Sequence, residues 1–232
     1  MLSLLRRVVR AFRNRYASPQ DYWNRRYRRL GSAYTGPGCI DLDETANRVD
    51  YDEKWAHLRS VLEAASIDRG AAVLDAGCGN GSITQHLVAS GYRVTAVDFS
   101  DAALAAARSR DLPGVVWLQS ALDAIESPDR FDAVVCIDVI HHIVDDAIFA
   151  RTIERLCSLA AGGGIVVVQT HFPDGDAFDV EAGQAAAHVR WRTREHLRST
   201  IPDGFTVRST ASYALPRERA TKELWVIARE RV

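Results

Sequence analysis

Three glycines and an acidic residue stand together in the stretch "VLDAGCGNGS", residues 73–82, which follows a short apolar run. Glycine permits sharp turns and lets a ligand approach the backbone closely, at a cost in conformational entropy. Gly77, Gly79 and Gly81 therefore predict a ligand-binding loop, and Asp75 ends the strand before it. A carboxylate at that place can accept hydrogen bonds from a ligand ammonium group or orient waters around it.

A second acidic residue, Asp98, closes the next β-branched run, "VTAVDFS", 17 residues beyond Gly81. In doubly wound sheets an acid at about this separation binds ribose hydroxyls. Phe99 beside it offers an apolar face for a purine. A glycine loop with a ribose acid also occurs in dinucleotide dehydrogenases, but the spacing here is G-x-G-x-G rather than G-x-G-x-x-G. The spacing thus favours a nucleoside site and disfavours a nicotinamide enzyme.

The elements that must position these residues begin at about residue 71, where β-branched runs alternate with helical stretches. Runs such as "VVVQ", without polar alternation, are typical of strands covered on both faces. The last two of the seven runs are separated by only a few residues around Pro216, too few for a helical crossover, so they should pair antiparallel. The sequence predicts an α/β fold with a doubly wound seven-stranded sheet, mostly parallel, ending in an antiparallel C-terminal hairpin.

The first 50 residues predict an N-terminal helical extension, or lid, before an α/β domain over residues 51–232. Apolar residues recur at helical steps over residues 2–16, and Ser18 and Pro19 are suited to begin a second helix. A third helix is expected over residues 47–65. Residues 1–40 carry nine arginines and one acidic residue, Asp21. This basic arm could meet an anionic substrate, nucleic acid or a membrane surface, or dock on the protein's own carboxylates.

The composition is that of an ordinary globular protein, with 47 % hydrophobic and 25 % charged residues. No apolar run approaches the roughly 18 residues of a membrane span, and we recognise no secretory signal. The four cysteines are scattered, without a C-x-x-C pair, which predicts reduced thiols in a cytoplasmic protein.

Four ordered segments, "VLDAGCGNGSIT", "VTAVDFS", "FDAVVCIDVIHHI" and "GGGIVVVQTHF", together resemble the class I S-adenosylmethionine-dependent methyltransferases over about residues 50–230. The resemblance implies a Rossmann-like fold and S-adenosylmethionine as cofactor. It implies that the glycine-rich loop wraps the methionine part, that Asp98 binds the ribose and that Phe99 lies against adenine. The cofactor residues carried over are Asp75, Gly77, Cys78, Gly79, Asn80, Gly81, Asp98, Phe99, Ser120, Ala121 and Leu122.

One position departs from the family pattern. Family members often read the adenine amino group with an acid after the third strand, where this chain has Ser120 and Ala121. Either Asp123 reaches round to the adenine, or main-chain groups of Ala121 and Leu122 read it.

The family places its catalytic groups after the fourth strand, which here brings Asp138, His141 and His142, with His171 after the fifth. Three interpretations remain open. In one, His142 packs against the sheet and His141 is a polar residue at a helix entrance. In another, His141 is the general base, aided by Asp138, because an imidazole near pKa 6.5 suits proton removal at neutral pH. In the third, all four residues bind Zn, Fe or Mn, similar to the ligand sets of some metal-dependent methyltransferases.

The resemblance further implies an acceptor pocket under the helical lid. Candidate acceptor-binding residues are Tyr22, Tyr34, Tyr51, His142, His171 and Trp191, although the aromatic residues could simply pack the helices. The predicted function is methyl transfer to an oxygen, or a nitrogen, of a small-molecule acceptor. No nucleic-acid partner is expected, because the short arm is the only basic surface. The alternatives are an RNA or quinone-precursor methyltransferase with a metal-assisted site, or a non-catalytic nucleotide-binding protein of the same fold.

Overall fold

The computed structural model of the chain describes residues 18–39, 41–172, 180–181, 189–214 and 221–230. The predicted helix over residues 2–16, and with it part of the basic arm, lies outside the described residues. Within them, no helix is both long and apolar enough to cross a membrane.

Among the described residues two helices precede the sheet, and local signals determine where each begins. Helix α2 (Pro19–Leu30) starts with proline, and the Ser18 hydroxyl accepts a hydrogen bond from the Asp21 amide at 3.1 Å. Helix α3 (Glu44–Ala64) is capped by Asp43, whose carboxylate accepts from the Ala46 amide at 2.8 Å. Because this cap precedes residue 47, α3 begins three residues earlier than the sequence predicts, and it runs without a break across the predicted domain boundary at residue 50.

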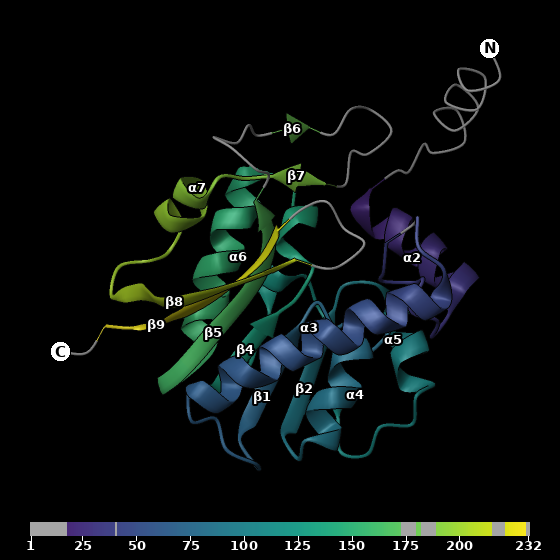
Figure 1. The fold of residues 1–232 in the computed structure, drawn as a ribbon, viewed down its shortest axis with the longest axis horizontal. Helices are drawn as coiled ribbons and strands as arrows, with labels where there is room; N and C mark the ends of the chain where they lie inside the picture. The colour runs from purple at the N-terminus through teal and green to yellow at the C-terminus, as the bar shows by residue number, and fades with distance from the viewer. Residues whose placement is uncertain (1–17, 40, 173–179, 182–188, 215–220, 231–232) are drawn as a thin grey trace.

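The predicted seven-stranded sheet is confirmed. Its strands lie in the order β3-β2-β1-β4-β5-β9-β8 (Figure 1). The first five are parallel, β9 is antiparallel to β5, and β8 is antiparallel to β9. The strands are β1 (Ala72–Ala76), β2 (Arg93–Asp98), β3 (Val116–Gln119), β4 (Phe131–Cys136), β5 (Ala160–Phe172), β8 (Phe205–Ala214) and β9 (Thr221–Arg229).

Short helices and turns connect the strands. The helices are α4 (Ser82–Ala89), α5 (Asp101–Arg108), α6 (Asp146–Leu159) and α7 (Arg194–Ser199). Two 3₁₀ turns, η1 (Leu122–Ala124) and η2 (Ile140–His142), follow β3 and β4. A small second sheet pairs β6 (Val180–Glu181) with β7 (Arg190–Trp191).

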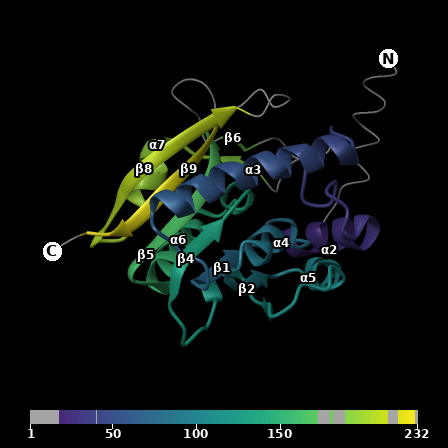
Figure 2. The same cartoon turned by 60° about the horizontal axis from the view of Figure 1, so that its bottom comes forward.

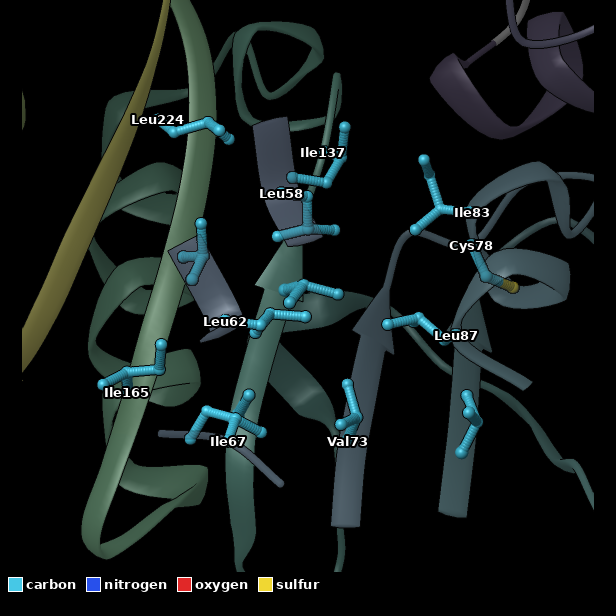
Figure 3. Packing of buried hydrophobic residues seen from close by; sticks show 14 of the residues in the cluster. Leu58, Leu62, Ile67, Val73, Cys78, Ile83, Leu87, Ile137, Ile165 and Leu224 are labelled. Atoms are coloured by element: carbon cyan, nitrogen blue, oxygen red, sulfur yellow. The ribbon is translucent and has the colours of Figure 1, made fainter. Parts of the chain in front are cut away.

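The core has two layers because successive residues of a strand point to opposite faces of the sheet. In β1, Val73 packs in the layer beneath α3 and α4, whereas Leu74 packs in the layer beneath α6. Figure 3 shows Leu58 and Leu62 of α3 against the sheet in the first layer. The C-terminal half of α3 is therefore part of the core, while the helix continues across the sheet toward α2 (Figure 2).

The strand order places a binding crevice at a predictable edge. The chain winds from β1 through β2 to β3 on one side and then returns to β4 on the other, so the order switches beside β1. Ligands of open α/β sheets bind beyond the carboxyl ends of the strands at such a switch. Asp75 and Asp98 both lie at this edge, near the carboxyl ends of β1 and β2.

Candidate active site

A cavity of about 290 Å³ opens at the carboxyl ends of β1, β2 and β4. Helix α2 contributes Pro19, Trp23 and Tyr27 to its wall. The residues predicted to bind the cofactor fall into two groups. Asp75, Gly77, Cys78, Gly79, Asp98, Phe99, Ala121 and Leu122 line the cavity, whereas Asn80, Gly81 and Ser120 lie outside its lining.

The glycine loop, residues 77–81, owes its course to backbone conformations that favour glycine. Its three glycines all have positive φ, between 54° and 81°. A Cβ on Gly77 would collide with the Val139 side chain, and one on Gly79 would lie 2.5 Å from the Tyr27 hydroxyl. The amides of Gly77 and Cys78 both donate to the Val97 carbonyl, at 2.8 and 2.9 Å. The loop is thus held against the end of β2, with no room for a side chain at Gly77 or Gly79.

Asp98 is fixed by backbone amides on both of its oxygens. Oδ2 accepts from the Gly79 amide and Oδ1 from the Ser100 amide, both at 2.9 Å. Burial raises the pKa of this carboxyl to about 6, although these hydrogen bonds act in the opposite direction. At pH 7.5 the group is therefore mostly ionised and suited to accept hydrogen bonds from two neighbouring hydroxyls.

Asp75 is the second buried carboxyl of the cavity. Its Oδ2 accepts from the Thr84 hydroxyl at 2.6 Å, which ties the end of β1 to α4. Burial raises the pKa of Asp75 to about 7, Thr84 lowers it, and the charge of Asp98 raises it. A cationic ligand group beside Asp75 would favour its ionised form.

The cavity is also lined by residues that follow β2 and β3: Phe99, Ala121, Leu122 and Asp123. The Asp123 carboxylate is held by the Arg151 guanidinium at 3.1 Å. Asp123, one of the two candidates for the group that reads adenine, thus lines the cavity, and its carboxylate already forms an ion pair with Arg151.

The cover loop, residues 31–39, joins α2 to α3 and is held from within. The buried Arg26 donates to the carbonyls of Thr35 at 2.9 Å and Gly38 at 2.7 Å. From α3, the Glu44 carboxylate accepts from the amides of Tyr34 and Thr35, at 2.8 and 3.0 Å. These bonds satisfy the backbone of a segment that has no regular secondary structure of its own.

Arg110 and Asn80 join the cover loop to the glycine loop. The Arg110 guanidinium donates to the Ser32 carbonyl at 2.7 Å and to the Asn80 carbonyl at 2.5 Å. The Asn80 side chain donates to the Ala33 carbonyl at 2.8 Å. Asn80 therefore positions the cover loop, which explains its burial outside the cavity lining.

Asp138 follows β4 and lines the cavity in an unusual backbone conformation. Its φ is +59°, a region in which a residue with a side chain is strained. Two buried ammonium groups hold its carboxylate. Lys54 of α3 forms an ion pair with Oδ2, and Lys222 of β9 approaches Oδ1 to 3.2 Å. Burial would raise the pKa of Asp138, but Lys222 and Lys54 outweigh it and hold the pKa well below its usual range.

The two adjacent histidines occupy different environments. His142 lines the cavity, with its ring edge-on to Trp23 at a centroid distance of 4.9 Å. His141 is only 6 % exposed, lies outside the lining, and stacks on Trp191 at 5.2 Å. Burial, with the neighbouring His142, lowers the pKa of His141 well below its usual value. Successive residues of the 3₁₀ turn η2 point in different directions, so only the His142 ring lines the cavity although the two ring centroids are 4.2 Å apart.

His171 belongs to the same aromatic group as His141. Its ring lies edge-on to Trp191 at 4.9 Å and 5.7 Å from the ring of His141, measured between centroids. Burial, and then the charge of Lys222, lower the pKa of His171 to about 3. Within the described residues, no group of three or more His, Cys, Asp or Glu side chains is arranged to hold a metal ion.

The predicted acceptor-binding tyrosines are also divided. Tyr51 of α3 lines the cavity. Tyr22 and Tyr34 lie outside the lining: the Tyr22 hydroxyl accepts from Arg26 at 2.9 Å, and the Tyr34 hydroxyl accepts from Gln85. His171 and Trp191 likewise lie outside it, around His141.

Sequence reasoning missed four side chains that form the site. Trp23 and Tyr27 wall the cavity, and Lys54 and Lys222 hold Asp138. A signal for the lysines was present, because they are the only two lysines among 29 basic residues. Trp23 and Tyr27 are four residues apart, a spacing that places them on one face of a helix, but the sequence does not indicate what that face covers.

A family model described as "Methyltransferase domain" matches residues 48–210 of the chain. Among relatives by sequence, the chain is 37 % identical over 106 residues to the ubiquinone biosynthesis O-methyltransferase of Azotobacter vinelandii, a stretch covering 44 % of each protein. It is 35 % identical over 140 residues to the enzyme of that name in Xanthomonas campestris pv. campestris, covering 57 % of each. The chain thus matches about half the length of these relatives.

Solved structures share the fold over more of the chain. The magnesium protoporphyrin IX methyltransferase of Synechocystis PCC 6803, solved with bound SAH, superposes with a TM-score of 0.69 and 22 % identity, covering 90 % of this chain and 97 % of that one. The [4+2]-cyclase SpnF also gives a TM-score of 0.69, at 16 % identity, covering 92 % and 97 %. At these identities the likeness shows the fold, and one fold can serve unrelated reactions.

Proposed function

The chain belongs to the methyltransferase-domain family, and on that premise we propose that it transfers a methyl group from S-adenosylmethionine to an oxygen or nitrogen atom of a small-molecule acceptor. The observation that carries the proposal is the pair of buried carboxylates, Asp75 and Asp98, on either side of the glycine loop in one cavity. The named activities of the sequence relatives support an oxygen acceptor.

The residues of the cavity fit this cofactor. The ionised Asp98, with both oxygens held in place, would accept hydrogen bonds from the two ribose hydroxyls. The glycine loop and Asp75 would hold the methionine part, whose ammonium group suits a buried carboxylate. Phe99 would lie against the adenine, with Ala121, Leu122 and Asp123 along its edge.

S-adenosylmethionine supplies, when bound, a methyl group already attached to a good leaving group. The protein's own residues then have three tasks: to align the acceptor, to exclude water and, for a hydroxyl acceptor, to remove a proton. Trp23 and Tyr27 of α2 exclude water from the glycine side of the cavity. Burial and the nearby Asp98 raise the pKa of Tyr27 well above its usual value, so its hydroxyl remains a hydrogen-bond donor.

We assign the general base to His142, in place of His141. His142 lines the cavity, so its ring can reach an acceptor there. His141 is enclosed by His142, His171 and Trp191, and its lowered pKa makes it a weak base at neutral pH. In this arrangement His141 supports the ring of His142 from behind, at a centroid distance of 4.2 Å.

Three further statements about the protein stay predictions: the division into an extension over residues 1–50 and a domain over residues 51–232, a cytoplasmic location, and the absence of a nucleic-acid partner. In support of a covering role for the extension, α2 walls the cavity and the cover loop is bonded to the glycine loop. Contact of the basic arm with a membrane surface remains the alternative for its first residues.

Two measurements test the proposal together. Calorimetric titration should detect binding of S-adenosylhomocysteine and no comparable binding of NAD. Transfer of a labelled methyl group should then be found in a panel of phenols, amines, thiols and carboxylic acids. Binding of NAD without S-adenosylhomocysteine would refute the proposal. Binding of S-adenosylhomocysteine without transfer to any acceptor would favour the non-catalytic alternative instead.

A further inference from the structure

The protein uses arginine for 27 of its 29 basic residues, and its only two lysines meet at one carboxylate. Lys54 and Lys222 are 3 % and 2 % exposed, and both Nζ atoms contact Asp138. A lysine ammonium is a compact point charge on a flexible stem, whereas a guanidinium is a planar fork that needs more room. Two compact ammonium groups can therefore converge on one buried carboxylate.

Further polar side chains are buried on the same side of the sheet as this lysine pair. Gln169 of β5 is fully buried, and neither polar atom of its carboxamide has a hydrogen-bond partner among the described residues. It lies on the same face of β5 as His171, two residues on, and His171 is paired in register with Lys222. His141 Nδ1 is also buried without a partner in the described part of the chain. Native proteins rarely leave such groups unsatisfied.

We propose that Lys54 and Lys222 are positioning residues that hold the Asp138 carboxylate at the cavity wall, where it accepts a hydrogen bond from a neutral hydroxyl of the acceptor. This inference rests on the proposed function and adds the chemical class of the acceptor. Asp138 alone of the three lines the cavity, and its positive φ turns it there. Strained backbone of this kind persists where the surroundings impose it, and here two ion pairs do so.

The same arrangement selects against a protonated amine. A lone carboxylate in a cavity would attract a cation strongly, but the charge of Asp138 is already compensated by two ammonium groups. A cationic acceptor would gain little from the carboxylate and would be repelled by the lysines behind it. A neutral hydroxyl, which brings no charge and offers one O–H donor, gains the hydrogen bond without that repulsion.

The lysine pair can be followed directly by NMR. Because the sequence has two lysines, protein labelled with ¹³C at lysine Cε gives two side-chain signals, and the variants Lys54→Met and Lys222→Met assign them. The labelled protein is saturated with S-adenosylhomocysteine and titrated with catechol or with benzylamine. We expect catechol to shift both signals, and the shifts to vanish in Asp138→Asn. Benzylamine should bind at least tenfold more weakly than catechol.

The affinity for catechol, measured from the change in the NMR signals of the protein or of the ligand during the titration, distinguishes a positioning role of the lysines from a purely structural one. In the wild type it should change little between pH 5 and pH 8. In Lys222→Met and Lys54→Met it should fall about tenfold at pH 8 and further toward pH 5, because Asp138 then gains a proton more readily. The groups that face Asp138 are Lys54 of α3, Lys222 of β9, His141 of η2 and His171 of β5. Lys222→Arg should restore part of the affinity.

Arg59→Met, an exposed substitution on the same helix as Lys54, serves as the matched control and should behave as the wild type. The affinity for S-adenosylhomocysteine, measured first, should be equal in all variants. A wild type that fails to bind it would refute the proposed function rather than this inference. Three results would each overturn the inference: lysine signals that do not shift when catechol is added, benzylamine that binds as tightly as catechol, and lysine variants that bind catechol like the wild type.

Discussion

The backbone amide of Gly79 donates to Asp98 Oδ2 at 2.9 Å, which makes the glycine loop and the acid at the end of β2 one hydrogen-bonded unit. The loop and the acid are 19 residues apart in sequence. Each therefore fixes the other, and a change in either should be felt by the whole cofactor site.

Asp98→Ala should lower the affinity for S-adenosylhomocysteine at least 100-fold. Two charge-assisted hydrogen bonds to the ribose are lost, each worth about 1.5–3 kcal/mol, and the Gly79 amide loses its partner. Calorimetric titration at pH 7.5 measures the loss. Asp101→Ala, on the exposed start of α5, is the control and should stay within twofold of the wild type. Equal affinities of Asp98→Ala and the wild type would exclude Asp98 from the ribose site.

Gly79→Ala should destabilise the protein by about 1–3 kcal/mol, since the new Cβ would adopt a φ of +54° and meet the Tyr27 hydroxyl at 2.5 Å. Adding Tyr27→Phe, which removes that hydroxyl, should recover part of the loss. Gly114→Ala shares the positive φ, at +74°, but has nothing within 4 Å, and so reports the backbone strain alone. Denaturant unfolding of the three variants and the wild type gives the comparison; a loss for Gly79→Ala no larger than that of Gly114→Ala would contradict the close contact.

Asp75→Asn should make the unliganded protein more stable at neutral pH while weakening cofactor binding. The folded-state pKa of Asp75, about 7, lies above its unfolded value of about 3.9. The protonated carboxyl therefore stabilises the fold fully below about pH 4, and this contribution is lost as the pH rises to 7. The variant has no proton to lose there, so its melting temperature should exceed that of the wild type by several degrees at pH 8 and by less at pH 5. A melting difference that grows as the pH falls would contradict the raised pKa.

His142→Ala should lower kcat by about 10²–10⁴-fold with little change in cofactor affinity, as expected for loss of a general base. His141→Ala should chiefly lower the free energy of unfolding, because it empties a packed space beside Trp191 and His171. Turnover of the acceptor found in the panel, measured beside unfolding curves, separates the two effects. The assignment fails if His141→Ala loses turnover at unchanged stability and His142→Ala does not.

Much of the fold could be predicted because it depends on local patterns. The β-branched runs and the short connection near Pro216 fixed the strands and the antiparallel hairpin, and the glycine spacing marked the loop. The earlier start of α3 could have been predicted as well, since Asp43 is a good helix cap.

The assembly of the site could not be predicted in the same way. Lys54 and Lys222 come from opposite ends of the chain and meet only because β9 inserts beside β5 and α3 crosses that face of the sheet. The different environments of His141 and His142 depend on the turn η2, which residue types do not specify. The topology of the fold determines which distant segments come into contact, and a single sequence gives only indirect information about that topology.

The C-terminal half of helix α3 packs in the hydrophobic core through Leu58 and Leu62, whereas one turn or more before them Tyr51 lines the cavity and Lys54 holds Asp138 at its wall. Because α3 is one continuous helix, a cavity or an oversized side chain under Leu62 would tilt the helix and displace Tyr51 and Lys54. We therefore expect directed evolution for new acceptors to select substitutions deep under α3 as often as in the pocket. Some changes in acceptor preference will then be accompanied by changes in thermal tolerance.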